Sequence, residues 1–380
     1  MRILIAIGVT RQQEAGAAGV VLNHARELGN LGHSVECWFL EDLLTKPAKP
    51  KRFEGLIFAI HLARRILRER NKYDVVNLHA PWGCVYGTWR RLAHPSDAPP
   101  YVLTMQGLEE RYAHAMSREA TKGLAKHFGW SNRMWHHIYH QTMYARSIRT
   151  ADFGMVANRE AWICAELKYN RANGTFWYVP NGVEECFLTP RVYSEKQGIR
   201  LLYVGSWIDR KGIYYLADAF GPLARINPCI SLTVAGCQAG PNAVRSYFAP
   251  ECHERLHVVP FVERADMPSL YLDHDIFVFP SLMEGMPLTL LEAMASGMPA
   301  VTTWSSGMAD VIEDGHNGLL VPPADGPALV KSIQHLAGSV ELRERIGRHA
   351  QETMRRYKWG QIAKKVEHVL EMGAENGAVQ

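Results

Sequence analysis

Short apolar runs alternate with longer amphipathic stretches from the first residues of the chain onward. The opening run, Ile3–Ile7, reads as a buried strand that ends at Gly8, and a polar loop containing glycines leads into Val20–Leu31. In that second stretch apolar side chains recur at helical spacing, Gly32 ends the pattern, and Val35–Leu40 reads as the next strand. This strand–loop–helix–strand order is the unit from which parallel α/β sheets are built.

The same alternation continues over the rest of the chain. It predicts strands at residues 75–78, 101–105, 153–156, 176–179, 201–204, 231–235, 256–260, 276–279 and 300–302, and helices at 53–69, 212–220, 267–271 and 288–296. Residues 109–150 are polar and aromatic and read as two or more helices, while Pro, Gly and charge at 185–199 indicate a linker. A chain of 380 residues exceeds what one core usually serves, so two α/β halves in tandem are expected. Ligands of such sheets bind beyond the carboxyl ends of the strands.

Composition narrows the function classes. Hydrophobic residues make up 47% and charged residues 21%, which excludes disorder over most of the length, and a net charge of +4 is too small to indicate nucleic acid. The opening run is too short for a signal peptide, and no apolar stretch is long enough to span a membrane, so we expect a cytoplasmic protein. Seven scattered cysteines without ligand spacing indicate reduced thiols and no structural zinc.

The charge is spread unevenly along the chain. Residues 1–190 hold 24 Lys and Arg against 17 Asp and Glu, and the remainder holds 18 against 21. The excess suggests an anionic acceptor or peripheral contact with the inner face of a membrane, and equally a solvated basic face. Phe53–Arg70 is basic and amphipathic, and we favour a helix packed on the sheet over one resting on a bilayer.

The most informative segment follows the expected strand at 276–279. A loop carries Glu284 and Gly285, and Pro287 stands where a helix would begin, a position that tolerates its missing N–H. Backbone N–H groups at the positive end of that helix would form an anion site suited to a diphosphate; these are the groups of Met286, Leu288 and Thr289.

Two carboxylates flank this helix start, Glu284 and Glu292. Eight helical steps bring their directions to within roughly 80° of each other. A carboxylate accepts two hydrogen bonds from vicinal hydroxyls, so one could hold a sugar and the other a ribose. The alternative is a pair of solvated surface carboxylates.

This segment resembles the E-x7-E motif of glycosyltransferase family 4, retaining enzymes of the GT-B fold. Three further segments are similar to that family in order and spacing: Val179–Val183, Val204–Gly212 and Asp310–Val321. The resemblance implies two Rossmann-like α/β domains that face each other across a cleft. It also implies metal-independent transfer of a sugar from a nucleoside diphosphate to an acceptor hydroxyl, with retention of configuration and no cofactor.

The resemblance implies roles for particular residues. Arg210 and Lys211 would neutralise the leaving diphosphate, which also makes physical sense for two cations that follow a strand and a glycine. Glu284 would position the sugar hydroxyls, and Glu292 would bind the ribose diol. The backbone near Gly19 and Gly205 would approach the donor phosphates. The family commonly has Arg directly after the first Gly of the phosphate loop, where this chain has Ser206.

The acceptor side departs from the family pattern. Gln106 stands where the family often has a His near the reacting sugar; Gln donates a hydrogen bond but is no general base near neutral pH. His79 ends the strand at 75–78 and either faces the cleft or is structural. The implied domains are 1–188 for the acceptor, 189–355 for the nucleotide sugar, and 356–380 as a helix crossing back to the first domain with a loose tail.

The sequence therefore predicts a glycosyltransferase, with a nucleoside-diphosphate sugar as donor and a glycan, glycolipid or small molecule as acceptor, in bacterial-type polysaccharide, lipopolysaccharide or glycolipid synthesis. Two rivals remain open. One is another enzyme on the same fold, such as a sugar-nucleotide epimerase or a phosphorylase. The other is an inactive glycosyltransferase-like protein that only binds sugar nucleotide or a partner, which the Ser206 and Gln106 departures keep open.

Overall fold

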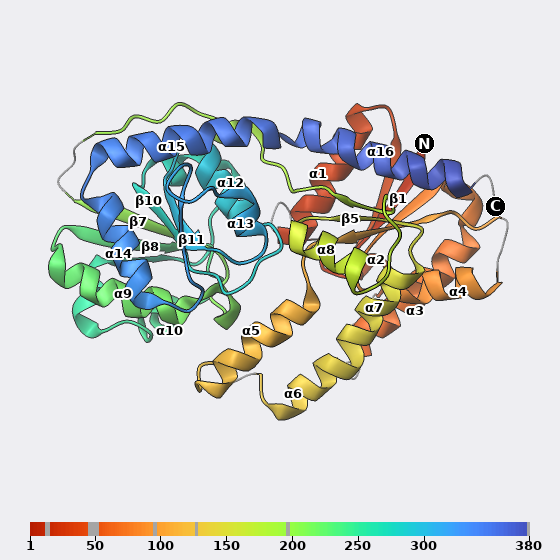
Figure 1. Cartoon of the computed structure of the whole chain (residues 1–380), viewed down its shortest axis with the longest axis horizontal. Helices are drawn as coiled ribbons and strands as arrows, with labels where there is room; N and C mark the ends of the chain where they lie inside the picture. Colours follow the sequence, from red (N-terminus) through yellow and green to blue (C-terminus); the bar gives the residue numbers. More distant parts are fainter. Residues whose placement is uncertain (12–15, 45–52, 94–96, 126–127, 195–197, 378–380) are drawn as a thin grey trace. The chain divides into compact units, whose positions relative to one another are not determined.

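The structure, a computed structural model, describes residues 1–11, 16–44, 53–93, 97–125, 128–194 and 198–377. They fall into two compact units (Figure 1). Unit 1 comprises Met1–Ala113, Trp130–Asn181 and Trp359–Gln380, and unit 2 comprises His114–Gly129 and Gly182–Lys358. Each unit is built on one six-stranded sheet, so the predicted pair of α/β domains is confirmed.

The sheet of unit 1 has the strand order β2-β1-β3-β4-β5-β6, and all its pairings are parallel. Its strands are β1 Arg2–Ala6, β2 Ser34–Trp38, β3 Val75–His79, β4 Tyr101–Met105, β5 Phe153–Val156 and β6 Phe176–Tyr178. The central strands β3 and β4 are buried at all five positions, because helices cover both faces of a parallel sheet. This burial explains their nearly continuous apolar runs.

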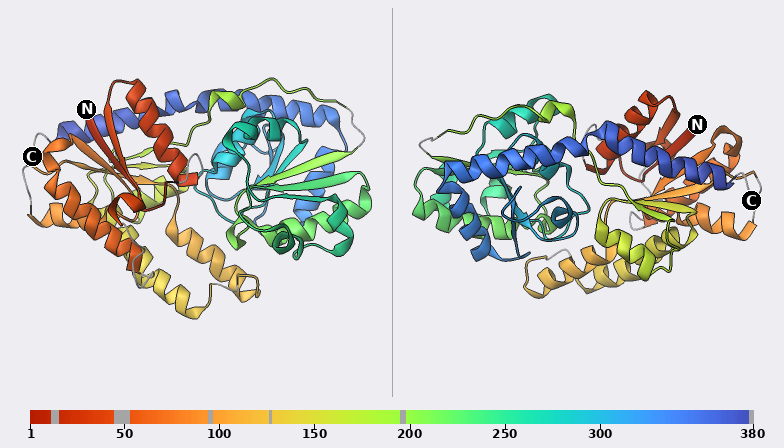
Figure 2. Two further views of the ribbon diagram at one scale, coloured as in Figure 1. Left: turned by 180° about the vertical axis from the view of Figure 1, so that it is seen from behind. Right: turned by 45° about the horizontal axis from the view of Figure 1, so that its top comes forward.

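Helices of unit 1 connect these strands. They are α1 Gly16–Asn30, α2 Leu40–Leu43, α3 Glu54–Arg68, α4 Cys84–Ala93, α6 Trp130–Trp135, α7 Gln141–Thr150, α8 Arg159–Leu167 and α16 Trp359–Gly377, while α5, Glu109–Thr121, begins in unit 1 and ends in unit 2. The helix α16 packs against α1 and against β3, β4 and β5, and Figure 2 shows α16 crossing α1. The last described helix, α16, thus packs on the same sheet that contains the first strand, β1.

Unit 2 repeats the architecture with the order β12-β11-β10-β7-β8-β9. Its strands are β7 Ile199–Val204, β8 Ile230–Ala235, β9 Leu256–Val259, β10 Ile276–Phe279, β11 Ala300–Thr303 and β12 Leu319–Val321. Its helices are α9 Ile213–Ile226, α10 Pro241–Arg245, α11 Met267–Leu272, α12 Leu288–Ala295, α13 Gly307–Val311, α14 Gly326–Ala337 and α15 Val340–Met354. The edge strand β12 was not expected from the sequence.

The units divide the chain at different residues from the expected 188/189 and 355/356. Residues 182–188, called the connector below, belong to unit 2 because they bond to its last residues. The N–H of Val183 donates to the carbonyl of Tyr357 at 2.8 Å, and Lys358 Nζ lies 2.9 Å from Glu185 Oε1. Residues 114–129 also belong to unit 2, where Tyr215 of α9 donates to Glu119 at 2.6 Å.

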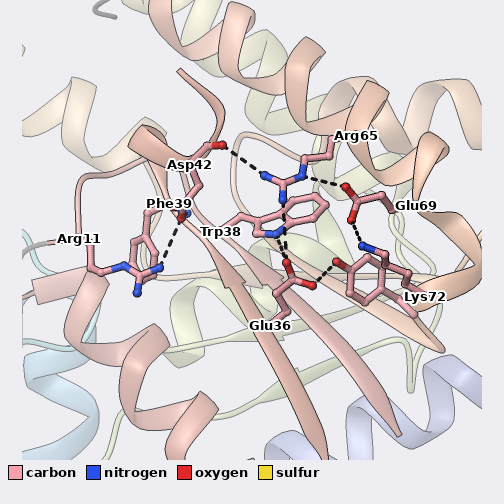
Figure 3. A network of polar contacts seen from close by, with 9 residues as sticks. Arg11, Glu36, Trp38, Phe39, Asp42, Arg65, Glu69 and Lys72 are labelled. Atoms are coloured by element: carbon pink, nitrogen blue, oxygen red, sulfur yellow. Dashed lines mark hydrogen bonds and ion pairs between the residues drawn. The ribbon is translucent and has the colours of Figure 1, made fainter. Parts of the chain in front are cut away.

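A polar network fixes α3 on the edge of the unit 1 sheet (Figure 3). The guanidinium carbon of Arg65 lies 4.1 Å from the centroid of the Trp38 ring, and Trp38 Nε1 donates to Glu36 at 2.7 Å. Arg65 also lies 3.2 Å from Glu69 Oε1. The guanidinium of Arg65 therefore already has partners within unit 1. Among the described residues, no helix combines the length and the apolar character needed to cross a membrane.

Candidate active site

The loop between β10 and α12 is held by its own polar contacts. Ser281 Oγ donates to Glu284 Oε1 at 2.9 Å, and Thr303 Oγ1 donates to the carbonyl of Ser281 at 2.6 Å. The backbone of Gly307 presses against this loop so closely that a Cβ there would lie 1.6 Å from the carbonyl oxygen of Gly285. Any side chain at Gly307 would push the loop away, so the small residue positions Glu284.

Glu284 lies at the centre of a buried ion cluster. Its Oε1 is 2.7 Å from Arg210 Nη1 and 2.8 Å from Lys211 Nζ. Burial alone would raise the pKa of Glu284, but the two cations outweigh it and lower the pKa to about 2. Burial lowers the pKa of Lys211, and Glu284 opposes that shift. Residues selected from two separate segments of the sequence therefore meet at one point.

The backbone after β7 explains how the two cations reach this point. Gly205 follows the strand, and residues Asp209–Lys211 form one turn of 3-10 helix. Gly212 then has φ of 72°, and a Cβ there would lie 1.9 Å from the carbonyl oxygen of Pro280, so only glycine fits. The tight turn sets Lys211 Nζ 4.8 Å from the centroid of the Phe279 ring, beside the end of β10.

The N-terminus of α12 lies directly after this loop. Pro287 is the N-cap residue, one position before the first helical residue where it was expected, and Leu288 and Thr289 open the helix. The first N–H groups of a helix have no acceptor within it, and they carry the positive end of its dipole. Gly285 and Met286 complete the loop ahead of them. A phosphate placed here would meet backbone donors.

Glu292 forms a second, separate cluster. Its Oε1 lies 2.5 Å from Arg264 Nη1, and its Oε2 accepts from the hydroxyl of Tyr271 at 2.9 Å. Burial raises the pKa of Glu292, while Arg264 and Tyr271 act in the opposite direction. The expected helical relation between the two glutamates is wrong, because Glu284 lies in the loop before α12 and only Glu292 lies in the helix.

The candidate acceptor residues lie in unit 1. Gln106 Oε1 accepts from Asn181 Nδ2 at 3.3 Å. His79 is 1% exposed, and within the described part of the chain neither of its ring nitrogens has a hydrogen-bond partner. Burial, together with nearby His24, lowers the pKa of His79 to about 3. His79 is therefore enclosed and neutral rather than open to a ligand.

Gly19 lies inside α1, which begins at Gly16, so the expected loop around it is the first turn of a helix. Its carbonyl accepts from Asn23 Nδ2 at 2.9 Å. The alanines at 17 and 18 favour helix, and this explains the early start. Gly19 can thus offer a helix N-terminus, not a flexible loop, to an anion.

Sequence reasoning missed Arg264, Tyr271 and His24. Arg264 and Tyr271 lie 28 and 21 residues before Glu292, and no local pattern links them to it. His24 lies on the buried side of α1, where a helical pattern expects an apolar residue. In the regions that the structure covers, no group of three or more His, Cys, Asp or Glu residues is arranged to hold a metal ion.

Comparison with known proteins shows what the region that contains this site is similar to. Residues 198–339 match the model of the family described as glycosyl transferases group 1. A phosphatidyl-myo-inositol mannosyltransferase of Mycobacterium leprae is 29% identical over 205 residues, which is 53% of this chain and 54% of that protein. The chain thus matches about half or less of the length of the first curated relatives.

Solved structures resemble the chain over nearly its whole length. Sucrose-phosphate synthase of Thermosynechococcus elongatus gives a TM-score of 0.78 at 19% identity, covering 98% of this chain and 99% of that one. Anabaena HepE in complex with UDP-glucose gives 0.70 at 17% identity, covering 98% and 100%. At these identities the likeness shows the fold, which is GT-B.

Proposed function

We propose that this chain, whose residues 198–339 belong to the group 1 glycosyl transferases, moves a sugar from a nucleoside-diphosphate sugar to an acceptor hydroxyl. The observation that carries the proposal is the buried cluster of Glu284, Arg210 and Lys211 beside the start of α12. Two cations and a helix N-terminus in one place suit a diphosphate whose charge grows as it leaves.

In this mechanism the bond from the anomeric carbon to the phosphate oxygen breaks, the acceptor oxygen forms the new bond, and the proton of the acceptor hydroxyl passes to the leaving diphosphate. Arg210 and Lys211 meet the charge of the leaving diphosphate, so we expect no metal requirement. Glu284 has a pKa of about 2 and is held by both cations, which makes it a poor nucleophile. We therefore assign it to the sugar hydroxyls and propose retention by attack on the face that the phosphate leaves.

The donor nucleoside extends from this cluster toward Glu292. A buried carboxylate held by Arg264 and Tyr271 has a fixed orientation and can accept from two ribose hydroxyls. Because HepE, a structural neighbour, binds UDP-glucose, UDP is the first nucleotide to test. Glu292, Leu288 and Thr289 are thus assigned to donor binding, together with the backbone at Gly205, Gly285 and Met286.

The acceptor is assigned to unit 1, near Gln106, and its class to glycans, glycolipids or small molecules. The name of the mycobacterial relative favours a glycolipid. The apolar face of α3 is buried in unit 1 through Phe58, Leu62 and Ile66, so this helix has little apolar surface left for a bilayer. Its exposed Arg64 and Arg68 would make a peripheral contact electrostatic, on the cytoplasmic side of a membrane rich in anionic lipids.

A thermal-shift panel tests the donor assignment. UDP, GDP, ADP, CMP and their common sugar conjugates are added in EDTA, and a rise in Tm for one nucleotide is expected because it binds the folded state only. The matching sugar conjugate is then incubated with candidate acceptors, and transfer is followed by mass spectrometry. No rise for any nucleotide, with the protein folded, contradicts the proposal.

The Ser206 and Gln106 departures favour one alternative, a protein that binds sugar nucleotide without turning it over. A nucleotide that raises Tm while no acceptor is glycosylated and no donor is hydrolysed would support that alternative. Conversion of the donor sugar in the absence of any acceptor would instead indicate an epimerase.

A further inference from the structure

Arg264 connects two parts of unit 2 that are far apart in sequence. It lies in the loop after β9, in the short helical turn Arg264–Asp266. One nitrogen, Nη1, is 2.5 Å from Glu292 Oε1 on α12, and the other, Nη2, is 3.1 Å from Glu184 Oε2 on the connector. A guanidinium carries its donors in a rigid plane, so one side chain can hold both carboxylates in a fixed relation.

Aromatic packing holds this arginine in place. The guanidinium carbon of Arg264 lies 4.7 Å from the centroid of the Phe187 ring, and Phe187 is fully buried at the end of the connector. Phe187 in turn meets the Tyr271 ring edge-on at 5.8 Å, and Tyr271 donates to the second oxygen of Glu292. Arg264, Phe187, Tyr271 and the two glutamates therefore form a closed set of contacts.

The connector follows Asn181, where the chain leaves unit 1. It also binds residues 357–358, just before the chain returns to unit 1 at Trp359. Val183 donates to the carbonyl of Tyr357, and Glu185 pairs with Lys358, the last residue before the chain re-enters unit 1. A shift of Glu184 would therefore move the connector at both points where the chain passes between the units, after Asn181 and after Lys358.

We propose that Arg264 is a positioning residue that fixes Glu292 for the ribose diol and ties it to Glu184, so that binding of the nucleoside is communicated to the connector. The inference rests on the proposed function, because it takes the diol as the ligand of Glu292. Each carboxylate oxygen has two acceptor positions, so the diol can bind without displacing Arg264 or Tyr271.

The charge of Glu292 depends on this arrangement. The titratable groups that act on it are Arg264, Tyr271 and Glu184. Burial raises the pKa of the Glu292 carboxyl, and the charge of Arg264 opposes that shift. Without Arg264 the carboxyl takes up a proton at higher pH and loses part of its capacity to accept from a diol.

The experiment compares a nucleoside diphosphate with its 2′,3′-dideoxy analogue, which lacks the diol. UDP, GDP and ADP and their analogues are titrated calorimetrically into the full chain from pH 6 to 9. Arg264→Met is expected to weaken binding of the nucleotide about tenfold or more near pH 7, since hydrogen bonds to charged groups contribute on that scale. The loss should shrink as the pH rises, and binding of the dideoxy analogue should be unchanged.

Two variants serve as controls. Arg225→Met removes the same charge from an exposed pair, Arg225 with Glu251 at 3.9 Å, and should leave both affinities unchanged. Arg264→Lys keeps the cation. Compared with Arg264→Met, it should recover most of the nucleotide affinity, and that affinity should change little with pH. If Arg264→Met weakens the nucleotide and the dideoxy analogue equally, Arg264 is merely structural and the inference is wrong.

The link to the connector has its own test. Glu184→Gln releases Arg264 from the connector, and it should change the affinity for the nucleotide severalfold while sparing the dideoxy analogue. Identical effects on the two ligands would overturn the link. If the wild-type protein binds nucleotide and analogue equally well, the ribose role of Glu292 fails instead, which identifies the proposed function as the faulty step.

Discussion

The two units bury polar groups in opposite ways. In unit 2, Glu284 and Glu292 are buried as ions, each beside a cation. In unit 1, His24 and His79 are buried as neutral rings, and in the described regions neither has a hydrogen-bond partner. Buried charge needs a partner of opposite sign, whereas a neutral ring can be enclosed at lower cost. The two units therefore stabilise their buried polar groups by different means, ion pairing in unit 2 and loss of charge in unit 1.

Acid should destabilise unit 1 at a higher pH than unit 2, and this is the largest effect that we expect. Burial lowers the pKa of His24 to about 4 and that of His79 to about 3, against 6.5 in the unfolded chain. Both groups then favour the unfolded state as the pH falls below 6.5, at a combined cost on the order of 4 kcal/mol by pH 5. The stabilisation from Glu284, with its pKa near 2, is lost only as the pH falls from 4.5 toward 2.

Hydrogen exchange at pH 7.5, 6 and 5 measures this order. Amides of β1 and β3 should lose protection before those of β7 and β10. His274 of unit 2 also has a lowered pKa, but its ring nitrogens contact Leu270 and Thr233. Earlier loss of protection in unit 2 would contradict the comparison, and His24→Leu should reduce the acid sensitivity of unit 1.

Removing one cation from the Glu284 cluster should affect turnover more than folding. Lys211→Met leaves Arg210 beside Glu284 but removes one charge that would meet the leaving diphosphate. We expect kcat to fall by about a hundred- to a thousandfold, as for loss of one preorganised charge or donor. Steady-state kinetics and thermal unfolding of the same sample measure both quantities. An unchanged kcat would remove Lys211 from the mechanism.

Neutralising the second glutamate should affect binding rather than chemistry. Glu292→Gln keeps the shape of the side chain but should weaken the hydrogen bonds that we propose it accepts from the ribose. Nucleotide affinity should fall by about 1–3 kcal/mol, with a smaller change in kcat. Equal affinity of variant and wild type in calorimetry would contradict the ribose assignment.

The smallest effect is expected from Tyr271→Phe. The hydroxyl of Tyr271 donates to Glu292 and also lies 3.2 Å from the carbonyl of Thr289, while the ring itself is fully buried. Its removal should cost about 1 kcal/mol of nucleotide affinity and leave the packing intact. A loss as large as that of Glu292→Gln would mean that Tyr271, not Arg264, orients the carboxylate.

Local patterns predicted most strands and the loop before α12. Buried strands appear as short apolar runs, and helix starts have characteristic residues at fixed positions. They also selected Glu284, Arg210 and Lys211 as residues that bind a ligand, but they did not predict that the three side chains contact one another. The pairing of Arg264 with Glu292 crosses 28 residues and depends on how a loop packs, which no periodicity encodes. His24 was missed for the opposite reason, since a polar residue on an apolar helix face breaks the pattern on which the prediction depends.

The order in which the two units can complete folding during synthesis follows from the place of α16. This helix covers β3, β4 and β5, yet it is synthesised after the whole of unit 2. A ribosome that has reached residue 358 has released every strand of unit 1 without the helix that closes its core. Unit 2 is therefore expected to fold first, while unit 1 waits with an uncovered sheet face that a chaperone can shield.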